Sequence, residues 1–507
     1  MAQVINSNIQ SLNSQRNLSA SQASLSTSLQ RLSSGTRINS AKDDAAGLAI
    51  SERFTSQIRG NQQAARNAND GISMAQTAEG GLSTAGDLLQ RVRELAVQSA
   101  NGTNSDSDRK SIQNEVSALS QELDRVANTT QFNGQNVLDG SLTSAQFQVG
   151  ANANQVINVG VQSAKASDIG NNTLSASYGD GKISTSTATT TNNVAAQTMT
   201  FKSGTGATTN VDVKLADSAK AIAANVNALS GSTGVTASAK TSATLSGLTT
   251  GTDGSVQFQL RGQNSIANDP NSTAVTISAK IKGNDLSAVA QAINAQSGTT
   301  GISASIKLNS TTQQKEVVLT EANGNDISIT NINGAADDRL AAASLRGAEK
   351  PATNPDTAAA APAPIGTGSA TVGGQLEFSS DSGFTLSSTT ADIVSAAKGS
   401  DLQSVSKIDV STVEGSNAAL KTIDSALNQI NSNRAALGAI QNRFASTISN
   451  LNTTTENLSA SRSRIQDTDF AQETANLTRG QILQQAGTAM LAQANSLPNG
   501  VLSLLRG

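Results

Sequence analysis

The chain of 507 residues contains no cysteine, no histidine and no tryptophan. Without cysteine there are no disulfides, and without cysteine and histidine there are no zinc sites of the usual structural kind. Ser–His and Cys–His nucleophiles and imidazole acid–base catalysis are excluded for the same reason. Carboxylate or lysine chemistry is all that remains for an enzyme, and the composition favours a protein without catalytic activity.

Charge and long apolar runs are also scarce. Charged residues make up 14% of the chain, against about 25% in ordinary soluble proteins. The net charge of −3 provides no cationic field for nucleic acid or an acidic membrane surface. No run of 18 apolar residues exists to span a membrane. Asn and Gln interrupt residues 1–20, where a secretory signal would be apolar. We therefore expect no nucleic-acid or membrane partner, and no export by the general secretory route.

The sequence divides into three parts of different character. Residues 1–165 and 400–507 have mainly helical patterns, whereas the middle is rich in Thr, Ser, Gly and strand patterns. This order predicts an α+β multidomain fold. The paired N- and C-terminal segments would form long coiled-coil-like helices, with the β-rich middle region inserted between them.

The C-terminal part has an apolar residue at every seventh position. This row consists of Ile423, Ile430, Leu437, Phe444, Leu451, Leu458 and Ile465. Such a repeat is typical of long helices packed side by side, and at ~1.5 Å per residue this helix would be roughly 65 Å long. A partner row of Ala68, Ala75, Leu82, Leu89 and Ala96 precedes a break at residues 101–104. A shorter helix follows, for which we expect Asp106 or Ser107 as the N-cap.

The two chain ends keep spaced apolar residues but carry almost no charge. Residues 1–36 contain only two charged residues, Arg16 and Arg31. Such segments alone bury too little apolar surface to offset an ordering entropy of about 1–2 kcal/mol per residue. We therefore expect them to be disordered in the free monomer and to fold when many copies pack. The packing positions expected in them are Ile5, Ile9, Leu12, Leu18, Leu25, Leu32, Leu483, Leu491, Leu502 and Leu505.

The middle region contains an internal repeat. The segment from Val226 to Ser238 recurs 67 residues further on, from Ile293 to Ser305. Each copy has a short Ala-rich helix, a Ser-Gly turn and a strand, so the repeats (about 213–240 and 282–307) predict two related α+β units. Whether they form one domain or two is left open.

Three long motifs resemble those of bacterial flagellin, the subunit of the flagellar filament. They are QRLSSGTRINSAKDDAAGLAI at 30–50, LQRVRELAVQSANGT at 89–103, and QILQQAGTAMLAQAN at 481–495 with VLSLLR at 501–506. The repeat in the middle is similar to an insertion motif of that family. The resemblance implies a terminal coiled-coil core domain (1–42 and 466–507), a helical inner shell domain (43–165 and 400–465) and a variable outer β-rich region (166–399).

The same resemblance implies a function and a set of partners. The chain would polymerise with copies of itself into the helical bacterial flagellar filament that drives swimming, located outside the cell. Export would use the flagellar type III apparatus without a cleaved signal peptide. The implied partners are the flagellar cap and hook–filament junction proteins, a flagellar export chaperone and host flagellin receptors. No cofactor, metal or catalytic residue is implied.

Four residues match positions that the animal Toll-like flagellin receptor recognises in related flagellins: Gln90, Arg91, Leu95 and Glu115. The alternative interpretation is structural, with Leu95 in a packing row and Arg91 and Glu115 forming ion pairs in the filament lattice. The two interpretations are compatible if the receptor recognises a surface that the polymer buries. Residues 30–51 are similar to the segment detected by plant receptors, except at Thr36 and Ser51.

Two other classes of function remain as alternatives. A secreted adhesin or binding module on a helical stalk would explain the helical ends and the β-rich middle. It would explain neither the segment at 30–50 nor the sparsely charged C-terminal end. An enzyme is the third alternative.

Overall fold

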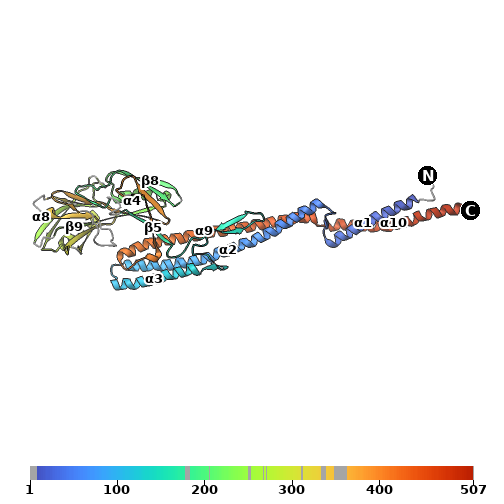
Figure 1. Ribbon diagram of the computed structural model, residues 1–507, viewed down its shortest axis with the longest axis horizontal. Helices are drawn as coiled ribbons and strands as arrows, with labels where there is room; N and C mark the ends of the chain where they lie inside the picture. The colour runs from blue at the N-terminus through green and yellow to red at the C-terminus, as the bar shows by residue number, and fades with distance from the viewer. Residues whose placement is uncertain are drawn as a thin grey trace. The chain divides into compact units, whose positions relative to one another are not determined.

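We analysed a computed structural model of the chain (Figure 1). It describes residues 8–176, 183–204, 206–248, 253–266, 268–269, 271–309, 312–332, 338–347, 362–394 and 396–505, with the backbone alone at 338 and 497–505. The chain divides into two compact units. Unit 1 contains residues 1–79, 142–161 and 435–507, and unit 2 contains residues 80–141 and 162–434.

The long helices lie at the two ends of the chain, as the sequence predicts, and short helices lie in the middle region. The helices are α1 (Ile9–Ser34), α2 (Ala45–Ala100), α3 (Asp106–Thr129), α4 (Ala219–Ala228), α5 (Ser230–Thr233), α6 (Ser287–Asn294), α7 (Ser297–Thr300), α8 (Asp338–Ala342), the 3-10 helix η2 (Val405–Lys407), α9 (Val413–Gln466) and α10 (Phe470–Leu505). The predicted break at residues 101–104 separates α2 from α3. The N-cap of α3 is Ser105, so the prediction of Asp106 or Ser107 was wrong. Ser105 forms a reciprocal capping box with Asp108, because the two side chains bond each other's backbone N–H.

The described strands pair antiparallel: four short ones lie at residues 131–159, within the helical N-terminal part, and most of the others form the β-rich middle. They are β1 (Gln131–Phe132), β2 (Gln135–Asn136), β3 (Ala145–Gln148), β4 (Val156–Val159), β5 (Gly170–Ala176), β6 (Ser186–Thr187), β7 (Gln197–Ser203), β8 (Thr208–Val213), β9 (Thr236–Ser246), β10 (Gly254–Arg261), β11 (Val275–Ile281), β12 (Ile302–Leu308), β13 (Lys315–Glu321), β14 (Ile327–Asn331), β15 (Ser344–Gly347), β16 (Ala363–Pro364), β17 (Ser369–Val372), β18 (Gln375–Ser380), β19 (Phe384–Ser388), β20 (Lys398–Gly399) and β21 (Asp401–Ser404). The predicted fold class is therefore confirmed: paired terminal helices flank an inserted β-rich region.

Helices α2 and α9 run antiparallel in each unit. In unit 2, Arg93 Nε donates to Asp424 Oδ1 at 2.7 Å. In unit 1, Gln441 Nε2 donates to Glu79 Oε2 at 2.9 Å. Later residues of α9 thus meet earlier residues of α2 (Figure 1). The seven-residue row of α9 lies in this seam, because its first four members are at most 1% exposed.

The outer β region of unit 2 has two apolar cores. One is built around Phe201 and Phe378, and the other around Phe258 and Ile329. The long strand β9 contributes to both, since Ala237 belongs to the first core and Leu245 to the second. The strand pairs with β18 over residues 236–240 and with β13 over residues 241–245. A shared strand therefore joins the two cores within one sheet.

The sequence repeat is also a structural repeat. In the first copy, the Asn227 side chain accepts from the Ala237 N–H at 2.7 Å and donates to its carbonyl at 2.9 Å. In the second copy, Asn294 makes the same two bonds with Ala304, at 2.6 and 2.9 Å. A left-handed glycine precedes each strand, with φ of 66° at position 234 and 72° at position 301. Each asparagine thus ties the end of a helix to the strand that follows it.

Candidate functional surfaces

The predicted packing residues differ in how far their own chain covers them. Ile423, Ile430, Leu437 and Phe444 are buried, and Leu451 is 9% exposed. Leu458 and Ile465 continue the row but are only partly buried. The cover that one chain provides therefore decreases along the C-terminal half of α9.

The terminal helices α1 and α10 lie side by side in unit 1 (Figure 1). At one end of this pair, Asn8 Nδ2 donates to the Ala494 carbonyl at 2.8 Å. At the other end, Arg31 lies 4.0 Å from Glu473. Between these ends, Leu25 packs over Gly480 and Leu18 over Gly487. A Cβ atom at Gly487 would lie 3.2 Å from the Leu18 side chain, so the glycines let the two helices approach closely.

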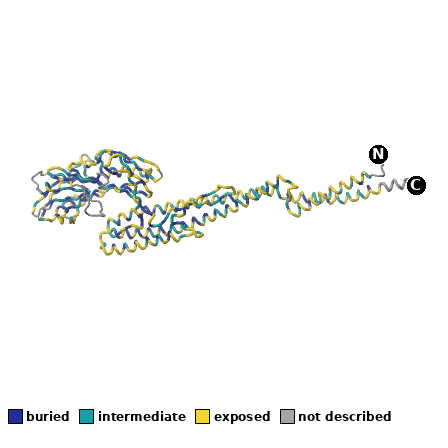
Figure 2. Tube along the Cα trace, viewed as in Figure 1, coloured by how far each residue is buried: buried dark blue, intermediate teal, exposed yellow. Residues whose placement is uncertain are grey.

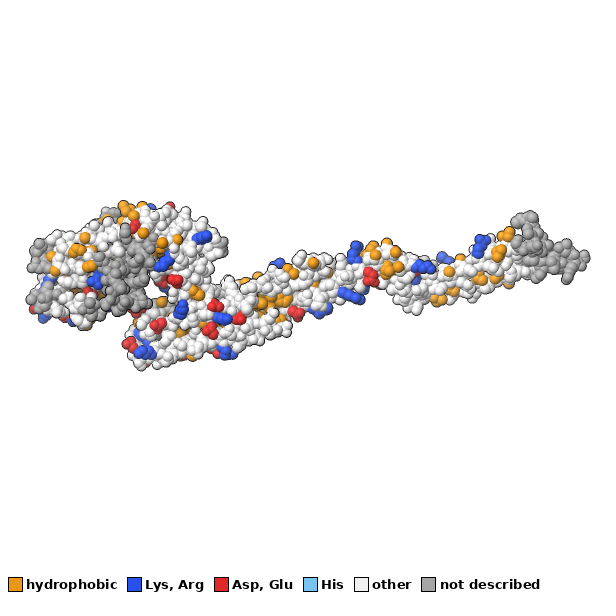
Figure 3. All heavy atoms as spheres, in the orientation of Figure 1, with side chains coloured by type: hydrophobic (Ala, Val, Ile, Leu, Met, Phe, Trp, Pro, Cys, Tyr) orange, Lys and Arg blue, Asp and Glu red, His pale blue; other side chains and the backbone are white. Residues whose placement is uncertain are grey.

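This helix pair leaves large apolar side chains exposed. Ile9 is 63% exposed, Leu12 54% and Leu483 50%, while Leu18, Leu25, Leu32 and Leu491 are partly buried. Figure 2 shows exposed positions along the described part of the pair, and Figure 3 shows apolar side chains spread over this part among few charges. Ile5 lies outside the described residues, as do the side chains of Leu502 and Leu505. One chain alone therefore does not cover the apolar surface of its terminal helices.

The four residues matched to receptor recognition lie on α2 and α3 in unit 2. Arg91 Nη2 lies 2.9 Å from Glu115 Oε1, and Arg91 Nη1 lies 3.0 Å from Glu94. Arg91 donates these hydrogen bonds, and they raise the pKa of its guanidinium, the bond to Glu94 contributing most and the bond to Glu115 next. Gln90 is exposed, whereas Leu95 is only 2% exposed and belongs to the core. Arg91 and Glu115 thus pair within one chain, and a further ion pair of these residues in the filament lattice stays a prediction.

A β-hairpin packs on α2 and α9 in unit 1. Its strand β3 places Phe147 edge-on against Phe444 of α9, with the ring centroids 5.7 Å apart. Gly71 faces the same Phe444 ring, and Gly60 faces Ala151 in the loop of the hairpin. Asn67 Nδ2 adds a hydrogen bond of 2.9 Å to the Gln148 carbonyl. Two glycines on α2 therefore make room for the hairpin and for the ring beneath it.

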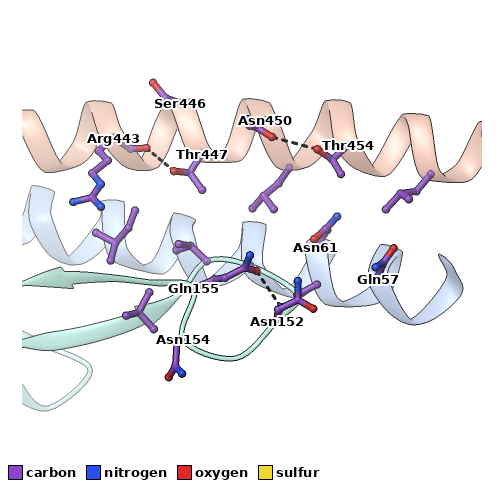
Figure 4. A pocket seen from close by; sticks show the side chains of 17 residues that line it. Gln57, Asn61, Asn152, Asn154, Gln155, Arg443, Ser446, Thr447, Asn450 and Thr454 are labelled. Carbon is purple, nitrogen blue, oxygen red and sulfur yellow. Dashed lines mark hydrogen bonds between the residues drawn. The ribbon is translucent and has the colours of Figure 1, made fainter. Parts of the chain in front are cut away.

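A groove of about 710 Å³ lies between this hairpin loop and the two helices (Figure 4). Its walls come from Gln57 and Asn61 of α2, from residues 149–152 and 154–157 of the hairpin, and from residues of α9 between Arg443 and Leu458. The side chains that line it are mostly amides and hydroxyls. Arg443 is the one charged residue among the lining residues.

A polar stripe on α9 holds the outer β region of unit 2. Lys421 Nζ lies 2.8 Å from Glu377 Oε2 on β18. Ser425 Oγ donates to the Gly170 carbonyl at 3.0 Å, and Gln429 Nε2 donates to the same carbonyl at 2.8 Å. Gln429 Nε2 also donates to the Asp381 carbonyl at 2.7 Å. Sequence reasoning did not identify this stripe, although the four-residue spacing of Lys421, Ser425 and Gln429 places all three on one helix face.

The described part of the chain contains no group of three or more acidic, His or Cys side chains that could bind a metal ion. Among its described helices, none combines the length and hydropathy of a membrane-spanning segment.

Family models match the chain at both ends and in the middle. The bacterial flagellin N-terminal helical region matches residues 5–143, and the bacterial flagellin C-terminal helical region matches residues 420–505. The flagellin hook IN motif matches residues 198–252, which include the first copy of the repeat.

Curated relatives match over the full length of the chain. The B-type flagellin of Pseudomonas aeruginosa is 42% identical over 511 residues, covering 100% of both chains. A flagellin of Salmonella typhimurium is 38% identical over 534 residues, and polar flagellin C of Vibrio parahaemolyticus is 35% identical over 508 residues. Both of these also cover 100% of each chain.

Proposed function

Because this chain belongs to the bacterial flagellin family, we propose that it is the structural subunit that polymerises into the helical flagellar filament. The observation that carries the proposal is the exposed apolar surface of the α1–α10 pair. Burial of apolar surface stabilises by about 25 cal/mol per Å², so copies that cover this surface gain free energy on association. A contact between copies that does not close into a ring produces a helical filament.

Electron microscopy of the purified chain after addition of salt or filament seeds tests this function. The expected result is long filaments of uniform diameter. A chain that stays monomeric under seeding, yet binds a surface or ligand through its β region, would instead support the adhesin alternative.

Export and capping by the flagellar apparatus belong to the same proposal. The subunit would leave the cell through the type III exporter with its chaperone, and would fold at the filament tip beneath the cap protein, beyond the hook–filament junction proteins. The support is the family membership together with the polar character of residues 1–20. The intact mass of secreted subunits tests it: residues 2–20 should be retained, and a product lacking them would contradict export without cleavage.

Recognition by innate immune receptors is a finer part of the proposal. Gln90, Arg91 and Glu115 offer exposed polar groups on neighbouring helices, and the buried Leu95 would hold α2 in place beneath them. Arg91→Ala removes the charge that both Glu94 and Glu115 contact, so monomer-induced receptor signalling should fall at least tenfold. Arg93→Ala removes a different α2 charge and serves as the matched control. Undiminished signalling by Arg91→Ala would contradict receptor recognition while leaving filament formation untouched.

A further inference from the structure

Met490 lies on α10 and is one of the most exposed large apolar residues of the described chain, at 62%. Leu483, seven residues earlier, is 50% exposed, and Ile482 beside it is 60% exposed. A spacing of seven residues places Leu483 and Met490 on the same helix face. Residues 480–496 carry no charged side chain. Met490 therefore belongs to an uncharged apolar face that its own chain leaves open.

The other described methionines are buried. The chain has four methionines, of which Met1 lies outside the described residues. Met74 of α2 is 3% exposed. Met199 of β7 is 0% exposed and belongs to the apolar core around Phe201. Among the methionines that the structure describes, Met490 alone is open to an oxidant dissolved in water.

A thioether sulfur reacts with hydrogen peroxide without help from another side chain. The sulfur lone pair attacks one peroxide oxygen, an S–O bond forms, the O–O bond breaks, and water leaves. The sulfur loses two electrons and the peroxide gains them. Because the chain has no cysteine, no thiol competes for the oxidant. The reaction turns a flexible apolar side chain into a polar sulfoxide.

We propose that Met490 is an oxidation-sensitive site of the free subunit, and that its conversion to the sulfoxide by a peroxide weakens assembly. The inference rests on the proposed function, because it takes the α1–α10 pair as a surface that neighbouring copies cover. A sulfoxide oxygen buried on this face needs a hydrogen-bond donor, which the side chains of Ile482 and Leu483 do not provide. Its burial therefore costs free energy that burial of the thioether does not.

The order of events decides the outcome. In the free subunit the oxidant reaches Met490, whereas a filament that has already formed covers the face and excludes it. Methionine sulfoxide reductases return the sulfoxide to the thioether, so the change is reversible. Oxidation thus acts on subunits that have not yet assembled.

Peptide mass spectrometry after brief treatment with hydrogen peroxide tests the site itself. In the monomer, Met490 should gain one oxygen atom roughly tenfold faster than Met74 or Met199, because exposure governs the rate. In filaments formed before the treatment, its oxidation should be roughly tenfold slower than in the monomer. A Met490 that reacts no faster than Met199 overturns the assignment, and equal rates in monomer and filament overturn the protection by assembly.

Seeded growth tests the effect on assembly. Met490→Leu keeps an apolar side chain of similar size without the sulfur, and each protein is compared with its own untreated sample. Peroxide should raise the concentration that the unmodified chain needs for growth by about tenfold or more, and should not change that of Met490→Leu. Reductase treatment should reverse the effect. Thermal unfolding of the treated chain should stay unchanged, since Met74 and Met199 are buried.

Two results would refute the role of Met490 in assembly. One is normal growth of a chain whose Met490 is fully oxidised, and the other is an equal loss of growth in Met490→Leu. Both leave the proposed function standing, because the untreated chain still assembles. Failure of the untreated chain to form filaments would instead refute the proposed function.

Discussion

Gly71 of α2 lies directly against the ring of Phe444 of α9: a Cβ atom at Gly71 would come within 2.6 Å of Phe444 Cζ. Phe444 is also the fourth member of the buried seven-residue row and the partner of Phe147 in the hairpin. This one contact therefore joins α2, α9 and the hairpin in unit 1. Only a residue without a side chain permits it.

Gly71→Ala tests that contact. Overpacking of this kind costs about 1–3 kcal/mol, so the free energy of unfolding should decrease. Gly438→Ala is the matched control, because its Cβ would meet no atom within 4 Å. That change should stabilise α9 by up to about 1 kcal/mol through helix propensity. Urea unfolding followed by circular dichroism measures both, and a Gly71→Ala variant as stable as Gly438→Ala contradicts the packing.

Gln429→Ala tests the polar stripe between α9 and the outer β region. The variant loses the bonds to the Gly170 and Asp381 carbonyls and should destabilise unit 2 by about 1–2 kcal/mol. Amide hydrogen exchange in β5 should accelerate at the same time. Asn428→Ala, at the exposed neighbouring position, should change neither quantity. Unchanged exchange in β5 for Gln429→Ala would mean that the stripe does not hold the sheet.

Asp326 predicts a dependence of stability on pH. Burial raises the pKa of its carboxyl to about 7, against the opposing effect of the hydrogen bond from Asn192 Nδ2 at 2.8 Å. Its Oδ1 atom is buried without a partner. Because the folded-state pKa lies above the ordinary value of 3.8, folding favours the protonated form. The contribution of Asp326 to stability is therefore fully present below about pH 4, is lost as the pH rises to about 7, and changes no further above it.

The size of this effect is on the order of 4 kcal/mol for a shift of about three pKa units. Asp326→Asn keeps an oxygen for Asn192 and removes the titrating group. Unfolding in urea at pH 5 and pH 8 should show the unmodified chain losing stability between these values, with a much smaller loss in Asp326→Asn. The same loss in both proteins would contradict a buried, titrating Asp326.

The two repeated asparagines should be energetically equivalent. Asn227→Ala and Asn294→Ala each remove two hydrogen bonds to the following strand and should cost about 1–2 kcal/mol. Asn225→Ala, on the exposed face of α4, is the control and should be neutral or slightly stabilising. Thermal unfolding measures all three. An Asn294→Ala variant that behaves like Asn225→Ala would show that the second copy does not use the bond.

Much of the helical architecture could be predicted because its signal is periodic. The row from Ile423 to Ile465 lies in one helix, and the repeat around Asn227 and Asn294 forms the same structure twice. Local chemistry was less decisive at helix ends. Ser105 was missed as the N-cap of α3 because Asp106 and Ser107 are also good caps.

Contacts between distant segments could not be predicted. Gly480 and Gly487 are seven residues apart, as are Leu25 and Leu18, but only the paired helices reveal that each glycine receives a leucine. Gly170 and Gln429 are 259 positions apart in the sequence. The burial of Asp326 depends on segments around Asn192 and β14 meeting in space. The depth of burial of Leu95, compared with Arg91 four residues earlier, likewise depends on the core beneath α2.

Seeded growth of a chain that ends at residue 469 tests the central claim most directly, namely that the terminal helices supply the surface for assembly. This truncation removes α10 and therefore the partner of α1. The account predicts that the truncated chain keeps the thermal unfolding transition of its outer β region but does not elongate seeds. Elongation of the truncated chain at the rate of the full chain would contradict it.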